Sequence, residues 1–460
     1  MRGVVRLGHQ GNDETLAAAA QQGQLIPVLT VDPRQYLDCR EEIARCLSAG
    51  IRLFRLFPRE QGWSINSEPF EQIVSQLRGH GAVLILSTGE WGTASAVGRH
   101  TADQDLAVLL TDTHYTQMAE TLAALRRWPQ LHALTNRLAT TGAVELMVRE
   151  VGCERVLFGS DTPTRPLQCA LNAVWFADIS EEERAAIFSG NADRLSGRLP
   201  VTAEPNAQPP PRSPFPLVDV HAHVGRFPYP EPGPLTDDIE ALDRNRRTFN
   251  LAEVFVSSID GIAYDLEEGN AQVADLLSQH SWLRGYVVVN PQQLAASAAA
   301  LDAHYRRPGF VGAKVHAEYS ATPTASRRMW ALFDEIAKRG RPVKIHNAGP
   351  DWEGALQHLA RSWPKLNIVI AHAGPGVPGQ EAIGLAASEA NVYLEFCTTY
   401  PTRGIVRYAV EKAGVEKILF GSDQRLIDPA YVLGIYQDAN LSRDEWARVA
   451  QGNPRQVFDF

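Results

Sequence analysis

The ten-residue segment GCERVLFGSD, which ends at Asp161, returns almost unchanged as GVEKILFGSD, which ends at Asp423. Each copy is an apolar run followed by Gly-Ser-Asp, a pattern typical of a buried strand that runs into a loop. The same interval of 262 residues carries Asn191 onto Asn453. Because solenoid repeats recur every ~20–50 residues, so long a period indicates a duplicated domain.

Other segments pair at nearly the same shift: VDPRQ (31–35) with VNPQQ (289–293), GIRLFRLF (50–57) with FVGAKVH (310–316), and AVLILSTG (82–89) with PVKIHNAG (342–349). Between the two copies, residues 200–216 hold seven prolines and almost no large apolar side chains. Such a segment cannot build a core and is expected to be an extended linker. The sequence therefore predicts a first domain over 1–199 and a second over 217–460.

Both halves alternate short strands rich in Val, Ile and Leu with helical segments. The second half contains eight such strands, each followed by a connection long enough for a helix, which is the pattern of a (β/α)8 barrel. The first half starts at VVRLGHQ (4–10), which corresponds to the second strand of the other half. We therefore predict an α/β protein with two tandem TIM-barrel-like domains, the first incomplete because its first strand is missing.

Residues of metal-ligand type end several strands of the second half. They are His221 and His223 in DVHAH, His346 in KIHNAG, His372 in VIAHAG and Asp423 in LFGSD. The two histidines of HAH lie two apart on a strand, so their side chains point to the same face. A barrel brings its carboxyl strand ends together around one axis, and imidazole and carboxylate suit zinc or a similar ion.

This five-part pattern over residues 215–460 resembles the amidohydrolase superfamily, and within it the relatives of aminocarboxymuconate semialdehyde decarboxylase. The resemblance implies one divalent metal ion, expected to be zinc, held by His221, His223, His346 and Asp423. It implies that His372 completes the coordination or contacts the substrate. It also gives Asp423 a catalytic task, the transfer of a proton between the attacking water and the leaving group.

Two lysines are expected to face the same barrel interior. Lys314 and His316 lie two apart in GAKVHAE and are predicted to bind the substrate. Lys314 is expected to bind an anionic group of the substrate or to form a hydrogen bond that supports the site, although two-metal members of the superfamily use a carboxylated lysine on this strand. Lys344 should lie deeper and needs a partner, for which Glu395 is the candidate. Asp219 is expected to support a ligating histidine through its second N–H.

The first half lacks most of these residues. With the repeat aligned, Leu86 takes the place of His346, Arg55 that of Lys314, Phe57 that of His316, and Asp112 or His114 that of His372, while Asp161 alone matches its counterpart. One carboxylate does not make a metal site. We therefore predict that the first half is a non-catalytic domain that packs on the second.

Composition sets further limits. The net charge of −9 argues against nucleic acid as the main partner, and no apolar stretch is long enough to cross a membrane. The five cysteines show no CxxC spacing, which favours free thiols and the cytoplasm. The expected partner is a small, anionic substrate. The resemblance leaves a homo-oligomer open, because relatives work as dimers of barrels.

These features favour a metal-dependent hydrolase that cleaves an amide, ester or lactone bond of a small carboxylated molecule. The alternative is a non-oxidative decarboxylase that uses the same site, which release of CO2 would distinguish. A non-catalytic scaffold or sensor is a third hypothesis, and purified protein without bound metal would favour it.

Overall fold

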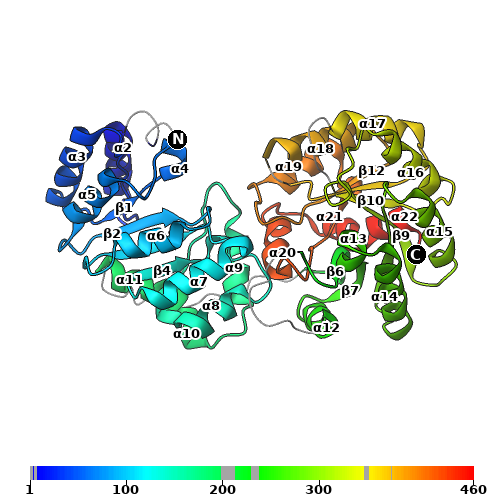
Figure 1. The fold of residues 1–460 in the computed structure, drawn as a ribbon, viewed down its shortest axis with the longest axis horizontal. Coiled ribbons are helices and arrows are strands. Elements are labelled where there is room, and N and C mark those ends of the chain that lie inside the picture. Colours follow the sequence, from blue (N-terminus) through cyan, green and yellow to red (C-terminus); the bar gives the residue numbers. More distant parts are fainter. Residues whose placement is uncertain (1–3, 5–7, 198–212, 229–237, 347–351, 375) are drawn as a thin grey trace. The chain divides into compact units, whose positions relative to one another are not determined.

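The computed structural model describes residues 4, 8–197, 213–228, 238–346, 352–374 and 376–460 (Figure 1). The chain forms two compact units. Unit 1 comprises Met1–Leu138, Gly142–Ser160 and Val174–Gln208, and unit 2 comprises Ala139–Thr141, Asp161–Ala173 and Pro209–Phe460. Most of the predicted linker, residues 200–212, lies outside the described residues.

Unit 2 contains an eight-stranded parallel sheet whose strands follow one another in chain order. The strands are β6 (Leu217–Val224), β7 (Leu251–Ser258), β8 (Leu283–Val289), β9 (Phe310–His316), β10 (Val343–His346), β11 (Ile368–Ala371), β12 (Val392–Glu395) and β13 (Ile418–Leu419). Nearly every residue of these strands is buried, as expected for a parallel sheet covered on both faces. The predicted eight-stranded, TIM-barrel-like sheet of the second half is confirmed.

The sheet curves until its last strand meets its first. Three backbone hydrogen bonds join them: Val220 N to Phe420 O at 2.9 Å, Asp423 N to His221 O at 2.7 Å, and His223 N to Gln424 O at 2.7 Å. A parallel bridge between Ala222 and Gln424 lies at the same seam. The barrel is therefore nearly closed, and the seam brings the HAH segment next to the second Gly-Ser-Asp turn.

Helices surround this sheet. They are α12 (Asp238–Thr248), α13 (Ile259–Ala263), α14 (Leu266–Gln279), α15 (Leu294–His304), α16 (Arg327–Ala337), α17 (Trp352–Ser362), α18 (Gly376–Ser388), α19 (Ile405–Ala413), α20 (Pro429–Gln437), α21 (Arg443–Ala447) and α22 (Asn453–Phe458). In α16, Met329, Leu332, Phe333 and Ile336 form the buried stripe, and Ser326 caps the first turn. Among the described residues, no helix is long and apolar enough to span a membrane.

The bottom of the barrel is filled with apolar side chains. The buried cluster there comprises Val218, Val220, Phe255, Tyr286, Val311, Val369, Tyr393, Leu419, Val457 and Phe458. Tyr286 satisfies its hydroxyl by donating to Val220 O at 2.9 Å. The residues of metal-ligand type, His221, His223, His346, His372 and Asp423, lie toward the other, carboxyl end of the strands.

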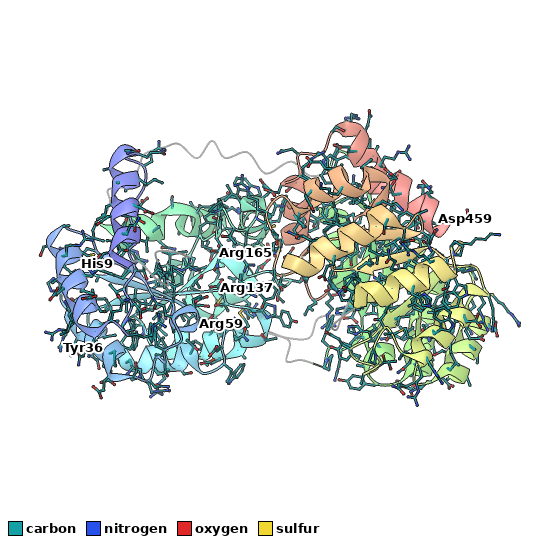
Figure 2. The ribbon with its side chains drawn as sticks, turned by 90° about the horizontal axis from the view of Figure 1, so that it is seen from above. His9, Tyr36, Arg59, Arg137, Arg165 and Asp459 are labelled. Carbon is teal, nitrogen blue, oxygen red and sulfur yellow. The ribbon has the colours of Figure 1, made fainter. Side chains whose placement is uncertain are left out.

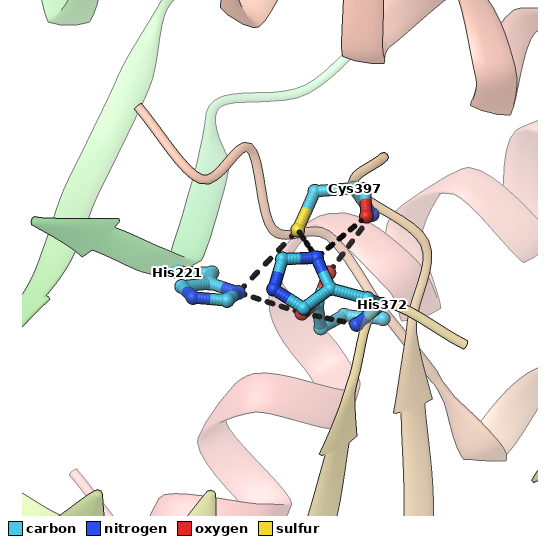
Figure 3. Close-up of side chains that lie close together, drawn as sticks. His221, His372 and Cys397 are labelled. Atoms are coloured by element: carbon cyan, nitrogen blue, oxygen red, sulfur yellow. Dashed lines mark hydrogen bonds and ion pairs between the residues drawn. The ribbon is translucent and has the colours of Figure 1, made fainter. Parts of the chain in front are cut away.

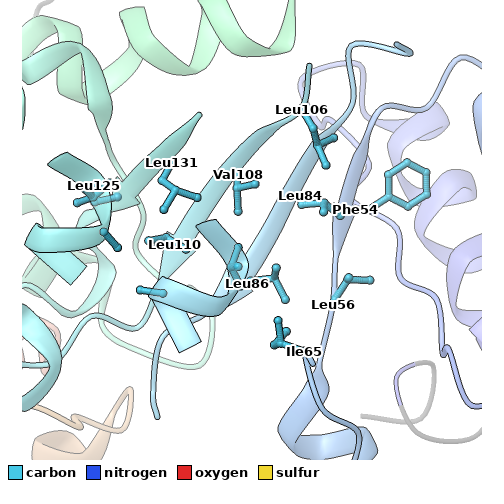
Figure 4. Close-up of a cluster of buried hydrophobic side chains, with 14 of the residues drawn as sticks. Phe54, Leu56, Ile65, Leu84, Leu86, Leu106, Val108, Leu110, Leu125 and Leu131 are labelled. Atoms are coloured by element: carbon cyan, nitrogen blue, oxygen red, sulfur yellow. The ribbon is translucent and has the colours of Figure 1, made fainter. Parts of the chain in front are cut away.

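Unit 1 contains a five-stranded parallel sheet in chain order: β1 (Leu53–Arg55), β2 (Val83–Ser87), β3 (Ala107–Thr111), β4 (Leu131–Leu134) and β5 (Val156–Leu157). Its larger core lies between the sheet and the helices (Figure 4), and Phe54, Leu84, Val108 and Leu110 are fully buried in it. The helices include α2 (Gly8–Gln21), α3 (Tyr36–Ser48), α5 (Glu68–Leu77), α6 (Thr93–His100), α7 (Met118–Arg127), α8 (Ala143–Val151), α10 (Glu181–Ala185) and α11 (Asn191–Ser196), and α9 (Leu167–Trp175) starts in unit 2.

The strand expected at residues 4–10 is wrong where the structure describes it. Val4 and residues 8–10 are helical, the latter as the start of α2, whose later alanine run favours helix. His9, labelled in Figure 2, and Asn12 both contact Glu42 of α3, at 2.7 Å each, which fixes α2 on that helix. In the segment before VDPRQ (31–35), Leu29 forms only an isolated bridge to Phe54. Within its described residues, the first half thus lacks more of the barrel than its first strand.

Several local features nevertheless recur at the interval of 262 residues. Both halves carry a π-helical turn, η4 (Ala186–Gly190) and η6 (Arg448–Gly452). Each turn follows a helix with a capping box. Asn191 donates to the carbonyls of Cys153 and Val156, and Asn453 donates to those of Val415 and Ile418. These likenesses agree with a duplication, which stays a prediction.

The capping box of Ser442 and Glu445, at the start of α21, should lose its contribution to stability in a defined range of acid pH. Glu445 caps Ser442 N at 2.7 Å and pairs with Arg407 at 2.9 Å, and the hydrogen bond from Arg407 is the main cause that lowers the pKa of Glu445 from 4.5 to about 2. Because the folded pKa lies below the unfolded one, this stabilisation is complete above pH 4.5 and is lost as the pH falls through about 2.

We expect Glu445→Gln to lower the free energy of unfolding by about 1 kcal/mol at pH 7. The difference from the wild type should shrink steadily between pH 4.5 and 2, measured by urea unfolding. Glu183→Gln, in the equivalent capping box of the first half, is the matched control. A difference that stays constant over this range would contradict the assignment.

Candidate metal centre

The seam of the barrel brings three metal-ligand atoms together. His221 Nε2 lies 3.1 Å from His223 Nε2, and Asp423 Oδ1 lies 3.4 Å and 3.1 Å from these two nitrogens. The three side chains are at least nine-tenths buried. Two residues of β6 and the turn after β13 therefore supply one compact group of possible ligands.

The contacts of Nδ1 in His221 and His223 fix the tautomer of each imidazole ring. His221 Nδ1 lies 2.7 Å from Glu395 Oε1, and His223 Nδ1 lies 3.1 Å from Ser257 Oγ and 3.3 Å from Ser257 O. A carboxylate or carbonyl oxygen only accepts, so both Nδ1 atoms donate, and both Nε2 atoms present lone pairs. Three acceptor atoms thus face one another at 3.1–3.4 Å.

A bound cation would offset the repulsion among these three acceptor atoms. Zinc lies ~2.0–2.2 Å from nitrogen and oxygen ligands, so two ligands of a tetrahedral ion lie about 3.3 Å apart. The separations among the three acceptors match that value. Their donor set therefore fits a divalent metal ion.

Glu395 supports this site through contacts with His221, His372 and Cys397, the three residues labelled in Figure 3. Its side chain is fully buried at the end of β12. Besides the bond to His221, Oε1 accepts from His372 N at 3.0 Å, and Oε2 accepts from Cys397 N at 2.9 Å. Orientation of a ligating histidine by a buried carboxylate is typical of metal centres.

His372 lies beside the three-ligand group. Its ring centroid is 5.0 Å from that of His221, and its Nδ1 lies 2.9 Å from Cys397 O. Because that carbonyl accepts, His372 Nε2 carries the lone pair. Cys397, which our sequence analysis missed, places Sγ 3.4 Å from His221 Nδ1 and 3.2 Å from His372 Nδ1. Its position two residues after Glu395, at a strand end, was the signal that could have revealed it.

Burial keeps His221 and His223 neutral. It is the main cause that lowers the pKa of His223 to about 4 and that of His221 well below its ordinary value. For Asp423, burial alone would raise the pKa, but the contact with His223 and the charge of the nearby Lys314 hold it below its ordinary value. Neutral imidazoles and an ionised carboxylate are the forms that bind a metal.

Both lysines face the interior, as predicted. Lys314 Nζ lies 3.4 Å from His221 Nε2, and burial lowers its pKa. Lys344 Nζ donates to Val220 O at 3.0 Å and lies 4.6 Å from the centre of the Tyr286 ring. The expected pairing of Lys344 with Glu395 is therefore replaced, because the oxygens of Glu395 are directed to His221, His372 and Cys397.

Asp219 supports the site through the backbone. Its Oδ1 accepts from His221 N and Ser422 N, each at 3.0 Å, and its Oδ2 accepts from Gln424 Nε2 at 2.7 Å. Burial raises its pKa to about 6. The expected bond to an imidazole N–H does not form, because that N–H of His221 is given to Glu395. Asp219 instead ties β6 to the turn after β13.

His346 belongs to a second group. Its ring stacks on that of His316, with centroids 3.9 Å apart and planes at 16°, and its Nε2 lies 3.7 Å from Glu318 Oε2. His316, Glu318 and His346 also satisfy the distances for a metal site. The assignment of His346 as a ligand beside His221 stays a prediction.

The first half contains no comparable group among its described residues, because all three groups of possible metal ligands lie in the second half. Its sheet register corrects one aligned position. Ser87 pairs with Thr111 as His346 pairs with Ala371, so Ser87 and not Leu86 corresponds to His346. Adjacent strand residues face opposite sides, so the shift by one residue exchanges the faces.

The backbone conformation after the strand distinguishes Asp112 from His114. Asp112 directly follows β3 and has φ +62°, and His372 directly follows β11 and has φ +58°. Asp112 thus corresponds to His372. It accepts from Asn136 Nδ2 at 3.1 Å.

Loss of the supporting carboxylate should weaken metal binding. Glu395→Gln removes the carboxylate that accepts from His221 Nδ1 and from the backbone N–H groups of His372 and Cys397. We therefore expect the metal affinity to fall about 10–100-fold while the fold is kept. Competition with a chelator measures the affinity, and circular dichroism checks the fold. Glu389→Gln, which changes a carboxylate bonded to Arg361 and Gln357, is the control. Unchanged affinity in Glu395→Gln would contradict the supporting role.

We compared the chain with known proteins and found similar solved structures but no matching curated protein. Solved structures that resemble it include 5-carboxyvanillate decarboxylase from Sphingomonas paucimobilis (16% identity, TM-score 0.40, 49% of this chain and 84% of that one) and 2,6-dihydroxybenzoate decarboxylase from Rhizobium (15%, 0.44, 53% and 98%). A dihydroxybenzoic acid decarboxylase from Polaromonas, solved with manganese, is also similar (15%, 0.42, 49% and 87%). At these TM-scores the structures carry no further argument.

The amidohydrolase family Amidohydro_2 matches residues 4–198 and again residues 218–460. The two matches together span nearly the whole chain and include every residue of the three-ligand group. The chain therefore belongs to the Amidohydro_2 family of amidohydrolases.

Proposed function

We propose that the second half is a metal-dependent hydrolase that cleaves an amide, ester or lactone bond of a small carboxylated molecule. The observation that carries the proposal is the group of three mutually facing acceptor atoms on His221, His223 and Asp423, at 3.1–3.4 Å. We further propose that the ion is zinc, because two nitrogens and one oxygen at these separations suit tetrahedral coordination.

A divalent cation in this site would supply a Lewis acid that polarises a carbonyl and acidifies water. The residues do the rest. Asp423, whose pKa is held below its ordinary value, can accept a proton from the attacking water and pass it to the leaving group. His223 and His221 are held in one tautomer by Ser257 and Glu395, and a bound cation would engage their Nε2 lone pairs, so they would not compete for that proton.

Lys314 is placed to bind an anionic group of the substrate. Its ammonium is almost fully buried and lies 3.4 Å from a histidine of the site. His372 presents Nε2 from the neighbouring strand end and can contact the reacting carbonyl or complete the ligand set. His316, next to His346, is proposed as a further substrate contact.

The alternative is non-oxidative decarboxylation at the same site. The buried Lys314, with Nζ 3.4 Å from His221 Nε2, favours binding of a substrate carboxylate beside the metal ligands. Product analysis separates the reactions: a hydrolase gives two fragments or an opened ring, whereas a decarboxylase releases CO2. A screen of carboxylated amides and lactones is the first experiment.

For the first half, over 1–199, we propose a degenerate copy of the barrel that has lost catalysis, joined by residues 200–216 to the catalytic domain over 217–460. The support is that its described residues contain no group of metal ligands while the family matches both halves. Its role as an internal partner of the second half and a homo-oligomeric assembly are further parts of this proposal. Five free cysteines agree with a cytoplasmic location.

Asp423→Asn should abolish turnover without unfolding the protein. The change removes the proton acceptor, so we expect a loss of at least about 10²–10⁴-fold in kcat, with an unchanged circular dichroism spectrum. Chelation should likewise inactivate the wild type, and added zinc should restore it.

Elemental analysis should then find one ion per chain. Two ions per chain would reject the single-site proposal and point to Lys314 as a carboxylated bridge. Full activity after chelation would contradict both the hydrolase and the decarboxylase hypotheses.

A further inference from the structure

The first LFGSD segment ends at Asp161, and the contacts of this residue indicate a role different from that of Asp423. It adopts φ +57°, the same value as Asp423, so the turn has the same left-handed backbone in both copies. Asp161 belongs to unit 2. Its carboxylate is in none of the three possible metal groups, and it accepts from Arg165 Nε at 3.0 Å.

Arg165 extends from this turn to the segment that follows β12. Its Nη1 donates to Thr399 O at 3.1 Å, and its guanidinium carbon lies 5.6 Å from the centre of the Tyr400 ring (Arg165 is labelled in Figure 2). The Arg165 and Asp161 side chains are only 14% and 22% exposed. Partial burial strengthens such charge-assisted bonds beyond those of ordinary surface pairs.

The segment Asp161–Ala173 is fastened to the barrel at further points within unit 2. Arg403 N donates to Thr164 O at 3.2 Å. Asn172, which is fully buried, donates to Ala430 O at 2.9 Å. These contacts hold the backbone of the segment that carries Arg165 in place.

The turn that Arg165 holds is connected to the metal centre. Thr399 lies two residues after Cys397, whose carbonyl accepts from His372 Nδ1 and whose amide donates to Glu395. A shift of the backbone at Thr399 would move the Cys397 carbonyl. The hydrogen bond that fixes the tautomer and orientation of His372 would then weaken.

We propose that Arg165, held by Asp161, is a positioning residue for His372: it fixes the turn formed by residues 397–400. On this proposal the first Gly-Ser-Asp turn is kept because its aspartate orients an arginine that braces the site, whereas the second aspartate is part of the site. The catalytic readout rests on the proposed function, but the structural readout does not.

The test compares Arg165→Met with the wild type in the full chain. We expect faster amide hydrogen exchange over residues 396–404, above all at Arg403, with unchanged metal content. We also expect kcat/KM to fall about 10–100-fold, because a displaced contact costs this much even when the chemistry is intact. Arg165→Lys should be intermediate, since an ammonium cannot bond Asp161 and Thr399 in the same fork geometry.

Arg149→Met changes an exposed arginine of α8 and is the matched control; it should alter none of the three readouts. Unchanged exchange over 396–404 in Arg165→Met would overturn the proposal. Loss of the metal would also overturn it, because Arg165 would then support the whole centre. If the wild type turns over no substrate, the proposed function fails, and the exchange data still decide the role of Arg165.

Discussion

Glu395 buries a carboxylate completely and directs its two oxygens at His221, His372 and Cys397. A buried charge costs several kcal/mol unless hydrogen bonds satisfy it, so these three donors are held where the carboxylate requires them. One consequence is the tautomer of His221, whose Nε2 must face His223 and Asp423. The geometry of the metal centre thus follows from a residue that is not itself among the three proposed ligands.

The closing of the barrel is the second requirement. His221 and Asp423 are about two hundred residues apart in the chain, and they meet because the first and last strands join at the seam. Asp219 reinforces that seam by bonding backbone and side-chain groups on both sides. Fold and site are therefore coupled: a looser seam would separate the ligands before it unfolded the barrel.

Much of this could be predicted from the sequence, because strand ends and ligand types are local signals. The HAH segment, His372, Asp423 and the eight strands of the second half were recognisable in this way. The partners of Glu395 and Lys344 were not, since an alternating pattern shows which side chains face inward but not which of them meet. The difference between Leu86 and Ser87 was missed for a related reason: a repeat aligned by letters leaves the strand register uncertain by one residue, and one residue changes the face.

The helix at the amino end of the first half shows another limit. A short apolar segment forms a strand only if neighbouring strands can pair with it, and the alanine run that follows favours helix instead.

The central claim, that one divalent ion is held by His221, His223 and Asp423, can be tested directly by anomalous X-ray diffraction from crystals of the metal-loaded protein. We expect a single peak between the two Nε2 atoms and the Asp423 carboxylate. A peak only among His316, Glu318 and His346, or none in the second half, would contradict it.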